Sequence, residues 1–348
     1  MVGRFVESQN NPSSDPLLLF LYGGPGCSGL TSSLTEWGPF LVNHDGRTLR
    51  LNEYSWNLKA NVLLLEAPAG VEFSYIDKGT LEWNDTRVSF LETLASFFAL
   101  ISRLLWTTGK RSDRNGILSQ KLNIDTTLLF AYSHAMLSEK LWQQTKTECC
   151  NGAIDGCPFH TFKGSDFCGS LVKNVTTNVW TSLLNPYDIY SQCENTLPDP
   201  YATYDKPCIN ETAVDTYLNS TEARKAFFAS AAVETYVTCN VEVTMFYEKE
   251  TQEMSDLVLN AIGKGVRVLL VYGDADLACN FMMGQRFASN LGRKLIMDKA
   301  PFMFDGLVGG SRTVYEGVEF VTIRGGSHLV AQSRPSMTLH IIDMFLNS

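Results

Sequence analysis

Two glycine-rich segments near the end of the chain hold an acid and a base that can work as a pair. The segment GDADLACN, residues 273–280, contains Asp274 and Asp276, and the segment RGGSHLV contains His328. A carboxylate that orients a histidine, which then takes the proton of a nucleophile, is the acid–base part of a catalytic triad. A solvated turn aspartate and an exposed loop histidine are the alternatives for each residue alone. The acid-then-base order favours the pair, and a Gly-x-x-Asp turn selects Asp276 over Asp274.

A third glycine-rich segment, GGPGCSG at residues 23–29, is suited to donate backbone hydrogen bonds. It directly follows the apolar run PLLLFLY at residues 16–22. Glycines at such a point let backbone N–H groups face a site without side chains in the way, which is how an oxyanion hole is built. An ordinary glycine-rich turn is the alternative interpretation of this motif alone.

The nucleophile of such a triad is harder to place. The segment AYSHA, residues 131–135, is a degenerate Gly-x-Ser-x-Gly, and Ser133 precedes the acid and the base in the order that a triad requires. The tight nucleophile turn needs small, permissive residues, and alanine tolerates its strain less well than glycine, which weighs against Ser133. Ser28 and Ser327 lie inside the other motifs, and we expect them to serve the turns.

Short continuous apolar runs predict the strands that position these segments. The runs cover residues 16–22, 61–66, 266–272 and 318–323. Glycine or proline follows the runs, as is typical of buried parallel strands, whose carboxyl ends carry function. Helical periodicity predicts helices over residues 85–106 and 335–346. Strands alternating with helices indicate an α/β fold.

Composition narrows the classes of function. The chain has 348 residues, of which 45% are hydrophobic and 19% charged, and this is ordinary for a large globular core. The net charge of -9 argues against a nucleic acid partner, which requires a basic face. No apolar run approaches the roughly 18 residues that a membrane span needs. We therefore expect neither nucleic acid binding nor a membrane span.

Cysteines and glycosylation sequons point to an oxidising, secretory history. Six of the nine cysteines fall within 60 residues, namely Cys149, Cys150, Cys157, Cys168, Cys193 and Cys208. No CxxC pair is present and His160 is the only histidine nearby, so we expect disulfides here and no metal or other cofactor. The sequons begin at Asn84, Asn174, Asn210 and Asn219. The first residues, MVGRFVESQ, contain no signal-like apolar segment, which indicates that a secretory sequence is incomplete here.

Several long segments together resemble the serine carboxypeptidases, close to the cathepsin A-like and carboxypeptidase Y-like members. These segments are FVESQNNPSSDPLLLFLYGGPGCSGL, SWNLKANVLLLEAPAGVEFSY, NPYDIY, VTCNVEV, VYGDADLACNF and TIRGGSHLVAQSRPSMTL. The resemblance implies an α/β-hydrolase fold with a mostly parallel central sheet. It implies Asp276 as the triad acid, His328 as the base, and the Gly23–Gly24 turn as an oxyanion site with the Gly24 amide as donor. Glu36 matches a family glutamate that helps to hold the terminal carboxylate of a substrate.

The family pattern breaks where the nucleophile should be. Serine carboxypeptidases carry their serine in a G-E-S-Y-A/G-G segment after the helix expected near residues 86–106, whereas TTGKRSDRNG follows here. The serine turn, its strand, the next helix and the next strand are expected to be skipped, which removes central strands of the sheet. A retained sheet must then pair strands that are normally separated or leave edges unpaired. Tyr22 also replaces a family asparagine that binds the terminal carboxylate.

The resemblance completes the expectations. It implies a first core part at residues 1–121, a disulfide-rich, partly helical insertion at 122–235 and a second core part at 236–348. It implies the disulfides Cys27–Cys239, Cys149–Cys168, Cys150–Cys157 and Cys193–Cys208, with Cys279 as a free thiol. The implied function is removal of carboxy-terminal residues from peptides and proteins in a lysosomal or secreted setting, in a chain that allows a homodimer. A catalytically dead binding or protective scaffold is the alternative.

Overall fold

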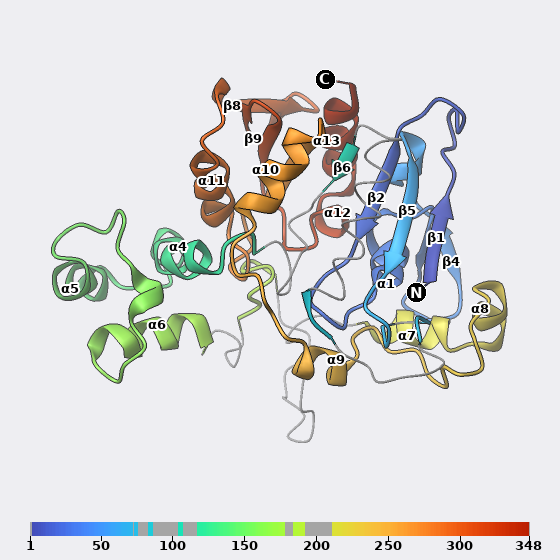
Figure 1. Ribbon diagram of the computed structural model, residues 1–348, viewed down its shortest axis with the longest axis horizontal. Helices are drawn as coiled ribbons and strands as arrows, with labels where there is room; N and C mark the ends of the chain where they lie inside the picture. The colour runs from blue at the N-terminus through green and yellow to red at the C-terminus, as the bar shows by residue number, and fades with distance from the viewer. Residues whose placement is uncertain are drawn as a thin grey trace.

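The computed structural model describes residues 2–71, 73–75, 83–85, 104–106, 117–177, 184–191 and 211–347. Its main strands form two sheets that are flanked by helices (Figure 1). These strands are β1 (Val2–Val6), β2 (Leu17–Leu21), β5 (Asn61–Glu66), β6 (Leu104–Trp106), β7 (Arg267–Gly273), β8 (Leu295–Phe304), β9 (Leu307–Tyr315) and β10 (Val318–Ile323). A separate hairpin is made of β3 (Phe40–Val42) and β4 (Leu49–Leu51).

The parallel pairs lie on the side of each sheet that faces the other sheet, next to the edge strands β2 and β6. The first sheet has the order β1-β5-β2 and the second has the order β6-β7-β10-β9-β8. The pairs β2–β5, β6–β7 and β7–β10 are parallel, whereas the pairs β1–β5, β9–β10 and β8–β9 are antiparallel. All four strands expected from apolar runs are present, with bounds that shift by one residue at most at either end. The predicted α/β fold is therefore confirmed.

Helices cover both faces of the second sheet. Alternate residues of β7 enter different clusters: Leu269 and Val271 pack with α13, whereas Leu270 and Tyr272 pack with α10 and α11. The helices are α1 (Gly29–Ser32), α4 (Gln120–Ser133), α5 (Glu139–Cys149), α6 (Phe167–Thr177), α7 (Thr212–Leu218), α8 (Thr221–Ala226), α9 (Val241–Phe246), α10 (Ser255–Gly263), α11 (Phe281–Asn290), α12 (Val330–Ser333) and α13 (Pro335–Asn347), with the short turns η1 (Ser33–Trp37), η2 (Trp56–Leu58) and η3 (Phe159–Thr161). Burial on two faces explains why β7 and β10 are continuous apolar runs.

The two sheets meet where β2 lies against β6. These strands are in contact, but within the described residues no strand pairing joins the sheets. One apolar cluster spans the junction, since it contains residues of β2 and β5 as well as residues of β7 and α13. The register places Trp106 opposite Leu269, so β6 pairs only with the amino-terminal half of β7. Among the described residues, the two sheets are thus held together by side-chain packing rather than by hydrogen bonds between their strands.

The prediction of a helix over residues 85–106 is wrong at its carboxy-terminal end. Residues 104–106 form strand β6 and pair with Arg267–Leu269, while residues 86–103 lie outside the described part. The run Leu104–Trp106 is apolar at three consecutive positions, a pattern that a buried helix and a buried strand share. Pairing with β7 is a tertiary contact, which local periodicity does not report.

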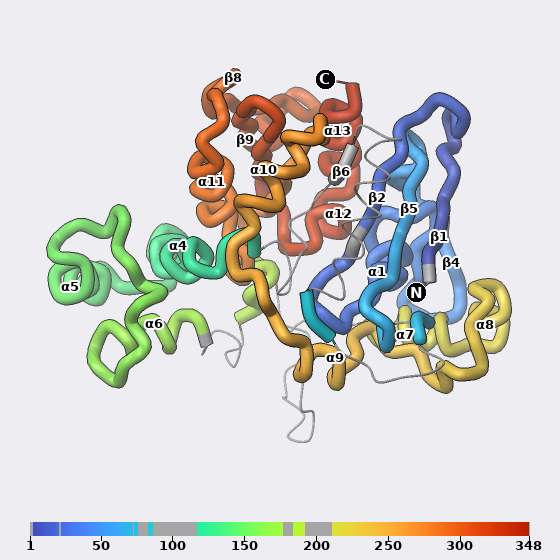
Figure 2. Tube along the Cα trace, viewed as in Figure 1, coloured from blue at the N-terminus to red at the C-terminus, as the bar shows by residue number. Residues whose placement is uncertain are grey.

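Helices α4 to α6 form an arm that projects from the body of the molecule (Figure 2). The arm has its own apolar cluster, built around Leu128, Trp142 and Phe159. The expected boundary between residues 121 and 122 falls inside α4, which also packs against α11 of the core. Within the part of the chain that the structure describes, every helix is too short or too polar to cross a membrane.

Candidate active site

Two loops at the carboxyl ends of neighbouring parallel strands bring an aspartate and a histidine together. Gly273, the last residue of β7, pairs with Ile323, the last residue of β10. The loops that follow these two strands therefore start next to each other at the same edge of the sheet. Nδ1 of His328 lies 2.7 Å from Oδ2 of Asp276, and these side chains are 1% and 5% exposed. An ionised Asp276 accepts a hydrogen bond from Nδ1–H, which makes Nε2 the ring atom that can take a proton.

Of the two aspartates after β7, Asp276 is the one that is hydrogen-bonded to His328. Asp274 accepts a hydrogen bond of 2.6 Å from the Gly325 amide, and burial raises the pKa of this carboxyl above its usual value. Asp274 therefore joins the acid loop to the base loop, while Asp276 faces the imidazole. Gly-x-x-Asp spacing was the signal that separated them.

The segment around Pro186 and Tyr187 connects the two loops. The Pro186 carbonyl accepts hydrogen bonds from the Leu277 and Ala278 amides at 3.0 and 3.1 Å. The Tyr187 carbonyl accepts one from the His328 amide at 2.8 Å, and the two ring centroids are 4.8 Å apart. Sequence analysis assigned this segment no role, although NPYDIY was among the family-like stretches that could have drawn attention to it.

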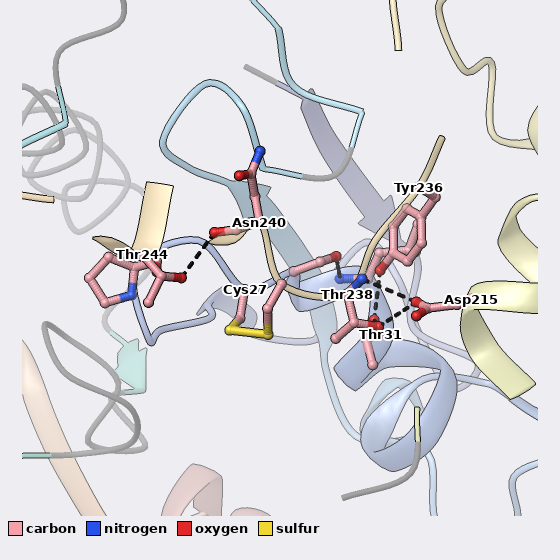
Figure 3. Close-up of a disulfide and its surroundings, with 11 residues drawn as sticks. Cys27, Thr31, Asp215, Tyr236, Thr238, Asn240 and Thr244 are labelled. Carbon is pink, nitrogen blue, oxygen red and sulfur yellow. Dashed lines mark hydrogen bonds between the residues drawn. A yellow bond between two sulfur atoms is a disulfide. The ribbon is translucent and has the colours of Figure 1, made fainter. Parts of the chain in front are cut away.

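The turn that contains Gly23 and Gly24 follows β2 and is held by a distant part of the chain (Figure 3). The disulfide Cys27–Cys239 joins the two segments. The Ser28 amide donates to the Thr238 carbonyl at 2.8 Å, and the Asn240 amide donates to the Gly26 carbonyl at 2.7 Å. A Cβ on Gly26 would lie 2.6 Å from the Asn240 carbonyl oxygen, and φ there is +103°. The close approach therefore requires glycine at this position.

A second layer of polar contacts holds Thr238 itself, as Figure 3 shows. Asp215 Oδ1 accepts from the Thr238 amide at 3.1 Å and from its hydroxyl at 2.7 Å. The Thr31 hydroxyl lies 2.9 Å from that of Thr238 and 2.6 Å from that of Tyr236. Asn219 donates to the Asp215 and Tyr236 carbonyls and accepts from the Tyr236 amide. Helix α7 and the residue that ends it thus support the glycine turn.

We expect Asn219→Ala to lower the free energy of unfolding by about 2–3 kcal/mol, because three hydrogen bonds of roughly 1 kcal/mol each are lost. Asn219 also begins a sequon, so Thr221→Ala is the matched control: it removes the sequon, keeps the amide, and changes an exposed residue. This control should change the unfolding free energy by less than about 0.5 kcal/mol. Urea titration measures both variants. Equal losses would show that glycosylation, and not the amide contacts, makes Asn219 important.

Comparison with known proteins decides the family. The sequence profile described as serine carboxypeptidase matches residues 4–105 and 114–348. This chain belongs to the serine carboxypeptidase family. The mouse lysosomal protective protein is 32% identical over 413 positions, covering 99% of this chain and 86% of the mouse protein. A serine carboxypeptidase of Caenorhabditis elegans is 28% identical over 406 positions, with the same two coverages.

A solved structure shows the same fold. The prohormone-processing carboxypeptidase Kex1 of Saccharomyces cerevisiae superposes with a TM-score of 0.73 at 19% identity, covering 99% of this chain and 86% of that one. The family profile is interrupted at residues 106–113, from the last residue of β6 to a point before α4. The mouse alignment is also longer than the 348 residues of this chain, so the mouse protein has residues where this chain has gaps.

Tyr22 directly precedes the glycine turn, and the charge of the buried Glu36 acts on it. Glu36 is 5% exposed and accepts a hydrogen bond of 2.7 Å from the Ser32 hydroxyl. Burial raises the pKa of the Tyr22 phenol well above its usual value, and the Glu36 carboxylate raises it further. Tyr187, whose ring packs on that of His328, also contributes to this shift.

Ser133 lies in a context that differs from a nucleophile turn. It is the last residue of α4 rather than a residue between a strand and a helix, and its hydroxyl donates to the Phe130 carbonyl at 2.9 Å. The apolar residues before it form part of the helix, because the Ser119 side chain caps α4 and the apolar positions pack in the arm. Ser133 therefore lacks the strand that strains and exposes the nucleophile in α/β-hydrolases.

The cysteines form three disulfides within the described residues: Cys27–Cys239, Cys149–Cys168 and Cys150–Cys157. These are three of the four expected pairs, and Cys193–Cys208 lies outside the described residues. Cys279 is buried and takes part in no disulfide among the described residues, and its amide donates to Asp276 Oδ1 at 3.1 Å. Burial raises the pKa of the Cys279 thiol well above its usual value, and the Asp276 charge adds to the shift.

The other expected glycosylation positions lie in different settings. Asn174 is exposed on α6. Asn84 forms an isolated bridge with Glu248, and Asn210 lies outside the described residues. Exposure makes Asn174 the described sequon whose modification disturbs the fold least.

Proposed function

We propose that this protein is a serine-type carboxypeptidase, which removes carboxy-terminal residues from peptides and proteins by hydrolysis. The proposal applies to a form of the protein that includes the nucleophile segment of its family. The observation that carries this proposal is the buried 2.7 Å contact between His328 and Asp276 at the carboxyl ends of β7 and β10. A buried imidazole oriented by a carboxylate is the arrangement that general base catalysis requires. Membership of the serine carboxypeptidase family supplies the reaction class.

Each residue then has a role in the proposed reaction. His328 takes the proton of the attacking serine and later gives it to the leaving amine, while Asp276 holds the imidazole and stabilises the imidazolium. The Gly24 amide and the amide after the serine hold the oxyanion. Glu36 contributes to the site for the terminal carboxylate of the substrate. Tyr22, where the family has asparagine, changes that site by placing a phenol in it.

The printed chain is proposed to lack the nucleophile turn. Support comes from the interruption of the family profile at residues 106–113 and from the gaps that the mouse alignment requires. Support also comes from the short β6, which lies against β2 and pairs with β7 where the two sheets meet. The printed chain is then inactive by itself, and a non-catalytic binding or protective scaffold is the second candidate function.

The proposed setting is lysosomal or secreted, with peptides or proteins that have a free carboxy terminus as substrates. Three disulfides within the described residues fit an oxidising compartment, and one of the similar proteins is a lysosomal protective protein. A homodimer belongs to the same proposal.

A fluorophosphonate probe tests the proposal on soluble, oxidised protein. We expect no adduct on the printed chain, because its sequence holds no Gly-x-Ser-x-Gly turn. A second chain, with a family G-E-S-Y-G-G segment and its flanking strands inserted between residues 106 and 114, should be labelled at the new serine, and His328→Ala should abolish this labelling.

Sequencing of full-length transcripts separates the two candidate functions. A longer message with a G-E-S-Y segment supports the carboxypeptidase, whereas a message without it favours the scaffold. Labelling of the printed chain at Ser133, lost in Ser133→Ala, would contradict the proposed site.

A further inference from the structure

A thiol, an imidazole and a carboxylate converge at the acid–base loops. Asp276, Cys279 and His328 each offer one ligand atom, and these atoms all lie within 4.8 Å of one another. The three residues are 3%, 1% and 8% exposed. Asp276 and Cys279 come from the loop after β7, and the Cys279 amide binds Asp276 Oδ1 at 3.1 Å. His328 comes from the loop after β10, so two loops supply one set of donors.

The types of donor select the kind of ion. One sulfur, one nitrogen and one oxygen are the ligands that Zn²⁺ prefers, and three protein ligands leave a fourth tetrahedral position open. Hard cations such as Ca²⁺ and Mg²⁺ require more oxygen donors. A thiolate and a carboxylate together balance the charge of a divalent ion, so the buried complex has no net charge and avoids the penalty of an uncompensated charge.

The distances require only small movements. In a tetrahedral zinc site, ligand atoms about 2.0–2.3 Å from the metal lie roughly 3.2–3.7 Å from one another. The imidazole and carboxylate atoms, now 2.7 Å apart, must separate by roughly half an ångström. The thiol must approach by about 1 Å at most. Rotation of side chains at the ends of two loops can supply both movements while the strands stay in place.

We propose that Asp276, Cys279 and His328 form a site for a thiophilic divalent cation, with Zn²⁺ as the ion of choice. The metal takes the place of the hydrogen on Nδ1 of His328, and that proton moves to Nε2, so the imidazole stays neutral. The metal also takes the place of the hydrogen on the Cys279 sulfur, and this proton leaves to solvent. Metal binding and the acid–base pair are therefore mutually exclusive. The proposal stands without the proposed peptidase function, because it rests on the ligand set and is read out by binding.

A second histidine–carboxylate pair in the same chain provides a matched control. His160 Nδ1 lies 2.8 Å from Asp125 Oδ1 in the arm. The cysteines of the described arm are all joined in disulfides, as Cys149–Cys168 and Cys150–Cys157, so they offer no thiolate. The two pairs have closely similar nitrogen–oxygen distances, but only the pair at the carboxyl ends of β7 and β10 has a thiol beside it among the described residues.

Isothermal titration calorimetry of the full oxidised chain with Zn²⁺ tests the site. We expect one tight equivalent in the wild type and in His160→Gln, with affinities equal within about twofold. Cys279→Ala and His328→Gln should each weaken binding at least about 100-fold, since loss of a ligand should exceed the 10–100-fold effect of losing an outer partner.

Co²⁺ in place of Zn²⁺ gives a readout that needs no variant. A thiolate-to-cobalt charge-transfer band should appear in the wild-type chain and saturate at one equivalent, because only a deprotonated Cys279 sulfur produces it. Absence of the band, absence of a tight equivalent in the wild type, or an affinity unchanged by Cys279→Ala would each overturn the proposal. An affinity lost in His160→Gln but kept in His328→Gln would place the metal in the arm and overturn it as well.

Discussion

Replacing Cys27 and Cys239 together by alanine should lower the free energy of unfolding by about 5 kcal/mol. The disulfide closes a loop with a sequence separation of 212 residues, and the loss of chain entropy in the unfolded state grows with loop length. A loss of this size is comparable to the whole stability of a typical domain, which is about 5–15 kcal/mol. Denaturant titration with intrinsic fluorescence measures the change.

The pair Cys150 and Cys157 is the control for this double replacement. Its sequence separation is only 7 residues, so its removal should lower stability by about half as much. The long-range disulfide also holds the glycine turn together with the contacts of Thr238 and Asn240. Equal losses of unfolding free energy for the two cysteine pairs would contradict the idea that loop length sets how much each disulfide stabilises the protein.

We also expect Gly273→Ala to destabilise the protein by about 3 kcal/mol or more. A Cβ at this last residue of β7 would lie 2.1 Å from the Gly326 carbonyl oxygen and 2.3 Å from that of Ser327. Both neighbours are backbone atoms, so the two loops must move apart, and overpacking of this kind costs roughly 1–3 kcal/mol or more. Because Asp276 and His328 lie on these loops, the 2.7 Å contact between them should lengthen.

Gly263→Ala is the matched control, since a Cβ at this last residue of α10 meets nothing within 4 Å. It should be neutral or slightly stabilising, because alanine reduces the freedom of the unfolded chain. Thermal unfolding measures stability, and the proton resonance on Nδ1 of His328 reports the hydrogen bond. A Gly273→Ala variant that keeps both would show that the loops do not need their close approach.

Much of the fold follows from local pattern. Four apolar runs predicted β2, β5, β7 and β10, because a parallel strand that is buried on both faces must be apolar at consecutive positions. The last helix was also predicted, with Pro335 at its start. Such features depend on residues that are near in sequence. Strand β6 was missed because its three residues are defined by pairing with Arg267–Leu269, which lie more than 160 positions away.

The sequence by itself determined which residues stand at the strand ends, namely the glycine turn after β2, Asp276 after β7 and His328 after β10. Motif order was enough for this, because strand ends are local features. The Gly-x-x-Asp spacing also selected Asp276 as the partner of His328, but only the tertiary structure showed that Asp274 binds the Gly325 amide. The tertiary structure also decided that Pro186 and Tyr187 join the two loops. It further decided that the Cys279 thiol lies close to the side chains of Asp276 and His328. These contacts depend on register between strands and on backbone hydrogen bonds across long separations, neither of which leaves a periodic signal in the chain.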